Sequence, residues 1–187
     1  MALWVPAVLA FYGPLNFLWI CNVCNFVLLA GLWRESSLLV SSQLAGVLLL
    51  DTIWTFDVAG GLLFGAQPLG ATAYMFDAAI PLHLRLLSLY HAAVPVVLLF
   101  AARRLGYHPG ALGLQSAITA VVLAVTLPLS PEDWNINWVH GPLVKQHLVP
   151  PLAYLAACVV AYPLLVYAPV HVLARRWLAS PADVTAR

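Results

Sequence analysis

The sequence predicts an all-α integral membrane protein: a bundle of five transmembrane helices with the N-terminus outside and the C-terminus in the cytoplasm. Hydrophobic residues make up 63% of the 187 residues, and charged residues only 8%. The apolar runs reach about twenty residues, the length that crosses a hydrocarbon core of ~30 Å. With five crossings, most of the 8 basic residues fall on one side of the membrane. These are Arg34, Arg103, Arg104, Arg175, Arg176 and Arg187.

Turn signals or arginines separate five apolar runs, and each run is assigned one span. The first follows the turn Tyr12-Gly13-Pro14 and ends at Arg34, and the fourth follows Pro109-Gly110. Proline suits the first turn of a helix, so the third begins near Pro81. The expected spans are residues 15–33, 37–56, 81–104, 111–127 and 151–173. Prolines inside the spans predict kinks, at Pro95, Pro163 and Pro169.

Residues 60–80 contain Gly60-Gly61, Gln67-Pro68 and Gly70, and such breaks are disfavoured in a helix exposed to lipid. We therefore interpret this segment as a broken interfacial piece and not as a sixth crossing. A sixth crossing would also scatter the arginines to both sides of the membrane. Because the longest polar connection, residues 130–146, is short, residues 1–187 should form a single transmembrane domain.

The positive-inside rule places the loop at Arg34, the loop at Arg103-Arg104 and the C-terminus in the cytoplasm. The N-terminus, residues 60–80 and residues 130–148 are then outside, and the expected location is the inner membrane of the cell. The N-terminus lacks the positive region of a secretory signal peptide, so we expect it to be retained. A net charge of +1 without a basic run argues against nucleic acid as a partner. The lipid bilayer is the main partner expected, with other membrane protein subunits as further candidates.

Ionisable side chains inside spans are costly in lipid and mark candidate sites. At ~1.5 Å of rise per residue, Asp51 on the second span and His91 on the third lie at a similar depth. Asp57 and Arg85 lie further outward on the same two helices and share a second level. The sequence therefore predicts two pairs, Asp51 with His91 and Asp57 with Arg85. Asn22 on the first span lies near the inner pair by the same count.

Two interpretations of the Asp51–His91 pair stay open. An aspartate that orients an imidazole serves a general base or a proton relay, which makes His91 and Asp51 the candidate catalytic residues. The same pair can simply fix helix register, where an interhelical hydrogen bond is worth ~1 kcal/mol. The candidates for binding a ligand are Asn22, Asp51, Asp57, Asp77, His83, Arg85, His91, Asn135, Asn137 and His140.

No cofactor and no metal site is expected from the pattern of ligand residues. His83 and His91 lie ~12 Å apart along one helix, too far to bind one metal together. Cys21 and Cys24 have the C-x-x-C spacing of dithiol oxidoreductases, but no second pair accompanies them. Redox chemistry and simple packing both stay open for these two thiols. The chain contains no nucleophile elbow, phosphate loop or zinc-protease motif.

Several motifs along the chain resemble those of a group of bacterial multipass membrane proteins to which no activity is assigned. The motifs are Tyr74-Met75-Phe76-Asp77, Leu87-Ser88-Leu89-Tyr90-His91 with Pro95, Arg103-Arg104-Leu105-Gly106-Tyr107, Asn135-Ile136-Asn137-Trp138 and Gly141-Pro142. The resemblance spans most of the chain. It implies a bacterial membrane protein with several spans, and it implies no catalytic residue.

Short loops and the lack of catalytic motifs favour a non-enzymatic polytopic protein. Such a protein is either an accessory subunit or a binder of a lipid or small apolar molecule. The alternative is an intramembrane enzyme that acts on a lipid through His91 and Asp51, with Arg85 near the headgroup. An enzyme predicts an open cavity that reaches His91 from outside. A proton-coupled transporter is disfavoured because no internal repeat is visible. A subunit instead predicts small residues on an apolar outer face, such as Gly46, Gly113 and Ala117.

Overall fold

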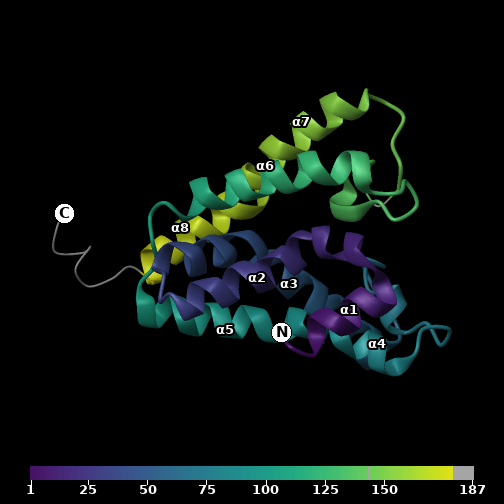
Figure 1. The fold of residues 1–187 in the computed structure, drawn as a ribbon, viewed down its shortest axis with the longest axis horizontal. Helices are drawn as coiled ribbons and strands as arrows, with labels where there is room; N and C mark the ends of the chain where they lie inside the picture. The colour runs from purple at the N-terminus through teal and green to yellow at the C-terminus, as the bar shows by residue number, and fades with distance from the viewer. Residues whose placement is uncertain (143, 179–187) are drawn as a thin grey trace.

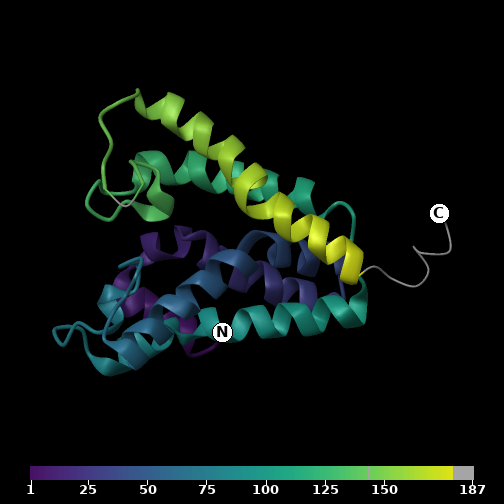
Figure 2. The same ribbon diagram turned by 180° about the vertical axis from the view of Figure 1, so that it is seen from behind.

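The computed structural model describes residues 1–142 and 144–178, and over these ranges the fold is all-helical, without strands. Four helical segments are long and apolar enough to cross a membrane, as expected for a multipass protein. They are α3 (Ser37–Phe64), α4 to α5 (Leu82–Leu105), α6 (Ala111–Leu129) and α7 to α8 (Pro151–Trp177). Figures 1 and 2 show α6, α7 and α8 on one side of the molecule and α1 to α5 on the other.

Shorter helical pieces precede, connect or divide these four segments. Before α3 lie α1 (Trp4–Tyr12), the 3₁₀ turn η1 (Pro14–Leu18) and α2 (Ile20–Trp33), and after it the 3₁₀ turn η2 (Ala73–Met75). The second segment divides into α4 (Leu82–Leu86), the 3₁₀ turn η3 (Leu87–Leu89) and α5 (Tyr90–Leu105). The 3₁₀ turn η4 (Ile136–Trp138) follows α6. The last segment divides into α7 (Pro151–Ala161), the π-helical η5 (Tyr162–Tyr167) and α8 (Ala168–Trp177).

The first expected span, residues 15–33, is broken in the structure. The chain turns at Gly13, whose φ of 76° suits glycine, and becomes α-helical only from Ile20. The 14 residues of α2 extend for ~21 Å, which is less than the ~30 Å of a hydrocarbon core. The turn predicted at Gly13 is therefore confirmed, whereas α2 alone is shorter than the span that the sequence suggested.

The central helix, α3, runs past its expected end at residue 56 to Phe64. Ser36 caps its first turn, since the side-chain oxygen accepts a hydrogen bond from the backbone nitrogen of Leu39 at 3.3 Å. Gly65 ends it in the left-handed conformation, with a φ of 66°. Residues 60–64, which were expected to belong to a broken segment, are thus helical, and the irregular chain begins at Gly65.

The prolines inside the last span coincide with a change of helix type. Pro163 lies in the π-helical turn η5, and Pro169 lies in the first turn of α8. A π-helical turn widens the helix locally and is one of the known causes of helix distortion. Pro95, in contrast, lies inside the continuous α-helix α5.

The segment that follows α5 forms hydrogen bonds with the end of α8 and with the start of α3. The backbone nitrogen of Tyr107 donates to the carbonyl oxygen of Leu178 at 3.0 Å, and that of His108 donates to the Ser41 hydroxyl at 2.9 Å. We call this end of the bundle the arginine end, and the opposite end, formed by η1, η4 and residues 65–81, the loop end (Figure 1). The arginine end carries Arg34, Arg103, Arg104, Arg175 and Arg176.

Candidate functional site

His91, the candidate catalytic imidazole, is stacked between two aromatic rings. Its ring centroid lies 4.6 Å from that of Trp54 on α3 and 4.1 Å from that of Tyr90 on α5. Its Nδ1 lies 2.7 Å from the carbonyl oxygen of Ser88 and donates to it, so Nε2 is the acceptor nitrogen of the neutral ring. The Trp54 indole donates to the Tyr74 hydroxyl at 3.2 Å, and burial raises the pKa of Tyr74.

The predicted pair of Asp51 and His91 is not formed. Asp51 is 2% exposed, and its Oδ2 has no hydrogen-bond partner among the described residues. A count of rise gives the height of a residue along a helix but not its direction around the axis, which changes by about 100° per residue. As a result, α5 directs the Tyr90 hydroxyl to Asn22 of α2 and stacks the next residue, His91, on Trp54 of α3.

The second predicted pair, Asp57 with Arg85, is also not formed. Asp57 accepts hydrogen bonds from the backbone nitrogen of Leu69 at 2.9 Å and from the backbone nitrogen and hydroxyl of Thr72 at 3.1 and 2.7 Å. Arg85 donates from Nη1 to the carbonyl oxygen of Met75 at 2.8 Å. The loop that follows α3 returns to the bundle and supplies backbone partners for both side chains. Both ionisable groups therefore hold this loop in place.

We expect Asp57→Asn to loosen the loop of residues 66–72. An amide offers one acceptor oxygen where the carboxylate uses two, and its NH₂ group would oppose the donors of Thr72. The expected loss is about 1–3 kcal/mol in the free energy of unfolding, with faster cleavage of this loop in limited proteolysis. Asp77→Asn is the matched control, because Asp77 lies in an exposed turn and its carboxylate accepts, among the described residues, only from the Ala79 nitrogen, at 2.8 Å. Equal cleavage of the two variants would contradict this role of Asp57.

Asn22 joins the start of α2 to η1 and α5. Its Nδ2 donates to the backbone oxygen of Asn16 at 2.8 Å and to the side-chain oxygen of Asn16 at 2.9 Å. Its Oδ1 accepts a hydrogen bond from the Tyr90 hydroxyl. All polar atoms of this buried amide thus contact the protein itself, next to the aromatic stack that holds His91.

The side chain of Asn137 bridges the break between η1 and α2. Its Oδ1 accepts from the backbone nitrogen of Ile20 at 2.9 Å, and its Nδ2 donates to the carbonyl oxygen of Leu18 at 2.7 Å. Both backbone groups lie at the interruption, where no regular helix satisfies them. The φ of Asn137 is 53°, a left-handed conformation that asparagine adopts more readily than most residues. Asn137 is 4% exposed, so its hydrogen bonds to Ile20 and Leu18 are buried and stabilise the loop end.

Asn135 and His140 form hydrogen bonds within the loop that contains Asn137. The Nδ2 of Asn135 donates to the carbonyl oxygen of Gly141 at 2.8 Å, and its Oδ1 accepts from the backbone nitrogen of His140 at 2.9 Å. The Nε2 of His140 lies 3.0 Å from the carbonyl oxygen of Ser130. These two candidate ligand residues are therefore engaged with the backbone of their own loop.

The other polar candidates lie at the surface of the loop end. His83 is exposed, and its ring lies edge-on to Phe11 at 5.7 Å between centroids. Glu132 and Lys145 form an ion pair on the loop after α6. The hydrogen bond and charge of Lys145 hold the pKa of Glu132 below its usual range.

A row of four hydrogen-bonded, buried side chains, which the sequence does not predict, links α3, α6 and η5. Gln43 donates to the side-chain oxygen of Gln115 at 3.1 Å, and Gln115 donates to the Thr119 hydroxyl at 3.4 Å. That hydroxyl lies 2.8 Å from the hydroxyl of Tyr167, and either of the two can donate the hydrogen bond. These four side chains are almost fully buried. The sequence feature that could have indicated these hydrogen bonds is a glutamine inside each of two apolar runs.

The cysteines and acidic residues do not gather into a metal centre in the part of the chain that the structure describes. No group of three His, Cys, Asp or Glu side chains among these residues is arranged to hold an ion. Cys21, Cys24 and Cys158 are free thiols, and Cys24 is fully buried. The structure therefore assigns packing contacts to Cys24 and leaves the redox question of the C-x-x-C pair untested.

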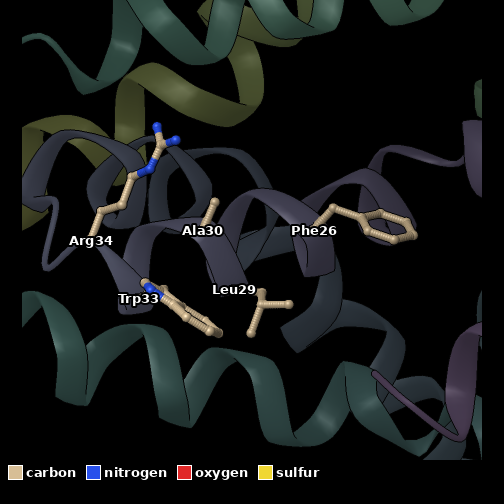
Figure 3. Close-up of a pocket in the computed structure, with 5 residues that line it drawn as sticks. All are labelled: Phe26, Leu29, Ala30, Trp33 and Arg34. Carbon is tan, nitrogen blue, oxygen red and sulfur yellow. The ribbon is translucent and has the colours of Figure 1, made fainter.

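Two pockets of the described residues lie at the surface, and neither is lined by His91 or Asp51. The first, which we call the α2 groove, has a volume of about 330 Å³ and is lined by Phe26, Leu29, Ala30, Trp33 and Arg34 (Figure 3). The second, of about 430 Å³, is lined by Glu132, Asp133, Asn135, Val144 and Lys145. Four of the five residues that line the α2 groove are apolar, whereas four of the five that line the second pocket are polar or charged.

The polar side chains of the loop end connect helices and loops, and the α2 groove is an open hollow lined mainly by apolar residues. Comparison of the chain with protein-family models, with curated proteins and with solved structures finds no match.

Proposed function

We propose that the chain crosses the inner membrane of a bacterial cell five times, with the loop end outside and the arginine end in the cytoplasm. In this arrangement α2 is the first crossing, the N-terminus is outside and the C-terminus is inside. The gathering of five arginines at one end of the bundle supports this orientation. A helix as short as α2 can span by local thinning of the bilayer and by an arginine that reaches toward the headgroups.

We propose that the protein is non-enzymatic and binds a lipid or another small apolar molecule in the membrane. One observation carries this proposal: apart from Asp51 and His83, the candidate polar side chains bond to backbone groups of their own chain, while the mainly apolar groove on α2 is open. Asp57, Asn135 and Asn137 each bond to backbone groups of their own chain. Side chains used in this way stabilise the loop end and leave few polar groups for chemistry.

An intramembrane enzyme that acts through His91 and Asp51 is the second candidate. The acceptor nitrogen of His91 and the unpaired oxygen of Asp51 favour it. An enzyme of this kind requires a cavity that brings substrate to the imidazole, and the two pockets described above lie elsewhere. The separation of the two side chains also removes the aspartate that would raise the basicity of the imidazole.

A role as an accessory subunit is favoured by one face of α6. Gly113 and Ala117 are exposed one turn apart, and a Cβ at Gly113 would meet no atom within 4 Å. Small residues at this spacing allow close approach of another membrane helix. Gly46 was expected on the same kind of face, and that prediction is wrong, because Gly46 is buried against Gln115.

The test is purification of the full chain in a mild detergent, followed by native mass spectrometry of everything that copurifies. The proposal expects lipid or another small apolar molecule bound in a defined ratio. A stoichiometric protein partner whose binding is lost in Gly113→Leu would instead establish the subunit role. Lipid turnover that is lost in His91→Ala, without loss of folding, would establish the enzyme and overturn the proposal.

A further inference from the structure

We infer that the α2 groove binds an anionic phospholipid of the cytoplasmic leaflet, with an acyl chain along the groove and the phosphate on Arg34. This inference rests on the proposed lipid-binding function and names its site and ligand class. The argument uses the shape of the groove, the charge at its end and its depth in the membrane.

The hollow of the groove comes from the spacing of its residues. Phe26, Ala30 and Arg34 are four residues apart and lie in one row on α2, and Leu29 and Trp33 form the neighbouring row. Ala30 is small, so the middle of the first row is open. Figure 3 shows Leu29 and Trp33 on the side that faces α5, with Arg34 extended toward the opposite side. The two rows thus form the sides of the α2 groove, which is open to the surface and follows the helix axis.

The end of the groove at Phe26 is held by aromatic packing. The ring of Phe26 lies 5.6 Å from that of Phe17 on η1 and 6.1 Å from that of Trp4 on α1, both in edge contacts. Edge contacts of this kind stabilise aromatic pairs beyond the area they bury. The wall is therefore formed before a ligand arrives, and the distance from Phe26 to Arg34 is ~12 Å of helix.

The other end of the groove carries an unpaired positive charge. Arg34 caps the C-terminal end of α2, is exposed, and forms no ion pair among the described residues. A guanidinium group binds phosphate through two parallel hydrogen bonds. The arginine end holds five arginines and, among the described residues, only the carboxylate of Glu35. This excess of positive charge favours an anionic headgroup over a zwitterionic one.

The depth of the groove matches a phospholipid better than a partner helix. Trp33 is 86% exposed beside Arg34, and tryptophan next to arginine is typical of the boundary between headgroups and acyl chains. The groove therefore runs from the headgroup level into the hydrocarbon. A helix of another protein would leave the Arg34 guanidinium without a phosphate partner, unless it carried an acidic residue at the same depth.

The test is titration of the detergent-purified full chain with dioleoyl-phosphatidylglycerol, or with dioleoyl-phosphatidylcholine, read by native mass spectrometry. We expect the wild type to bind phosphatidylglycerol about tenfold more tightly than phosphatidylcholine, because the choline cation neutralises the charge of the phosphate that both lipids carry; a factor of ten corresponds to ~1.4 kcal/mol. Arg34→Gln should remove this preference. Ala30→Phe should weaken the binding of both lipids, because it fills the α2 groove.

Arg104→Gln is the matched control, because Arg104 lies at the same end, over the ring of Phe100 and outside the groove. It should keep the full preference. A preference that survives in Arg34→Gln, or that falls equally in Arg104→Gln, would overturn the inference while leaving lipid binding itself intact. Failure of the wild type to bind either lipid would remove the inference together with the proposed function. If Ala30→Phe does not fold, the comparison of the two arginine variants still decides.

Discussion

Gly46→Leu is expected to destabilise the fold more than any other substitution considered. A Cβ at this position would collide with the side chain of Gln115 on α6. Overpacking costs about 1–3 kcal/mol in the free energy of unfolding, and displacement of a buried hydrogen-bonded amide adds about 1–3 kcal/mol. We therefore expect a loss of about 2–6 kcal/mol, measured by denaturant unfolding in detergent, or failure to purify a monodisperse protein.

Gly113→Leu is the control for this prediction. Both variants place a leucine for a glycine inside a long apolar helix, but a Cβ at Gly113 meets open space. Its stability should stay within about 0.5 kcal/mol of the wild type or rise, because glycine is a poor helix former. If the two variants were equally stable, the close packing of α3 against α6 would be incorrect.

Asn137→Ala is expected to lose about 2–4 kcal/mol in the free energy of unfolding. The substitution leaves the buried nitrogen of Ile20 and the carbonyl oxygen of Leu18 without partners, and each unsatisfied buried group costs about 1–3 kcal/mol. Hydrogen exchange should speed up at the start of α2, around Ile20. Denaturant unfolding and exchange measured by mass spectrometry check the two parts of the prediction.

Asn25→Ala is the matched control, because Asn25 is an asparagine on α2 whose buried Nδ2 has no hydrogen-bond partner. Its removal should cost less than about 1 kcal/mol, since no hydrogen bond from that nitrogen is lost. If both asparagine variants destabilised the protein to the same extent, the hydrogen bonds of Asn137 to Ile20 and Leu18 would not be the source of its stabilising effect.

Local signals in the sequence were sufficient to locate the four long apolar helical segments, but not the short α2 in place of a full first span. The break at Gly13, the start of α6 at Ala111 and the start of α7 at Pro151 follow from turn residues next to apolar runs. The arginines likewise mark one end of the bundle, because charge is excluded from the hydrocarbon whatever the packing. The extension of α3 to Phe64 was missed because two neighbouring glycines were read as a break. In the structure, Gly61 instead makes room for the ring of Phe76.

The candidate site was harder to predict because it depends on contacts between distant parts of the chain. Asp51 is buried and His91 is half-buried, but the partners of each side chain depend on how its helix is rotated, which the sequence does not show. Asn137 and Ile20 are 117 positions apart, and no local pattern connects them. The hydrogen bond between Gln43 and Gln115 was not predicted for the same reason. A glutamine in an apolar run shows that its amide needs a hydrogen-bond partner, but it does not show which residue that partner is.

The central claim is that the five arginines share the cytoplasmic side while the loop end faces outward. Single cysteines at positions 34, 103 and 145, placed in a chain whose three native cysteines are replaced by serine, test it most directly. In intact cells, a membrane-impermeant maleimide should label only position 145, and positions 34 and 103 should react after the membrane is opened. Labelling of positions 34 and 103 from opposite sides would contradict the account.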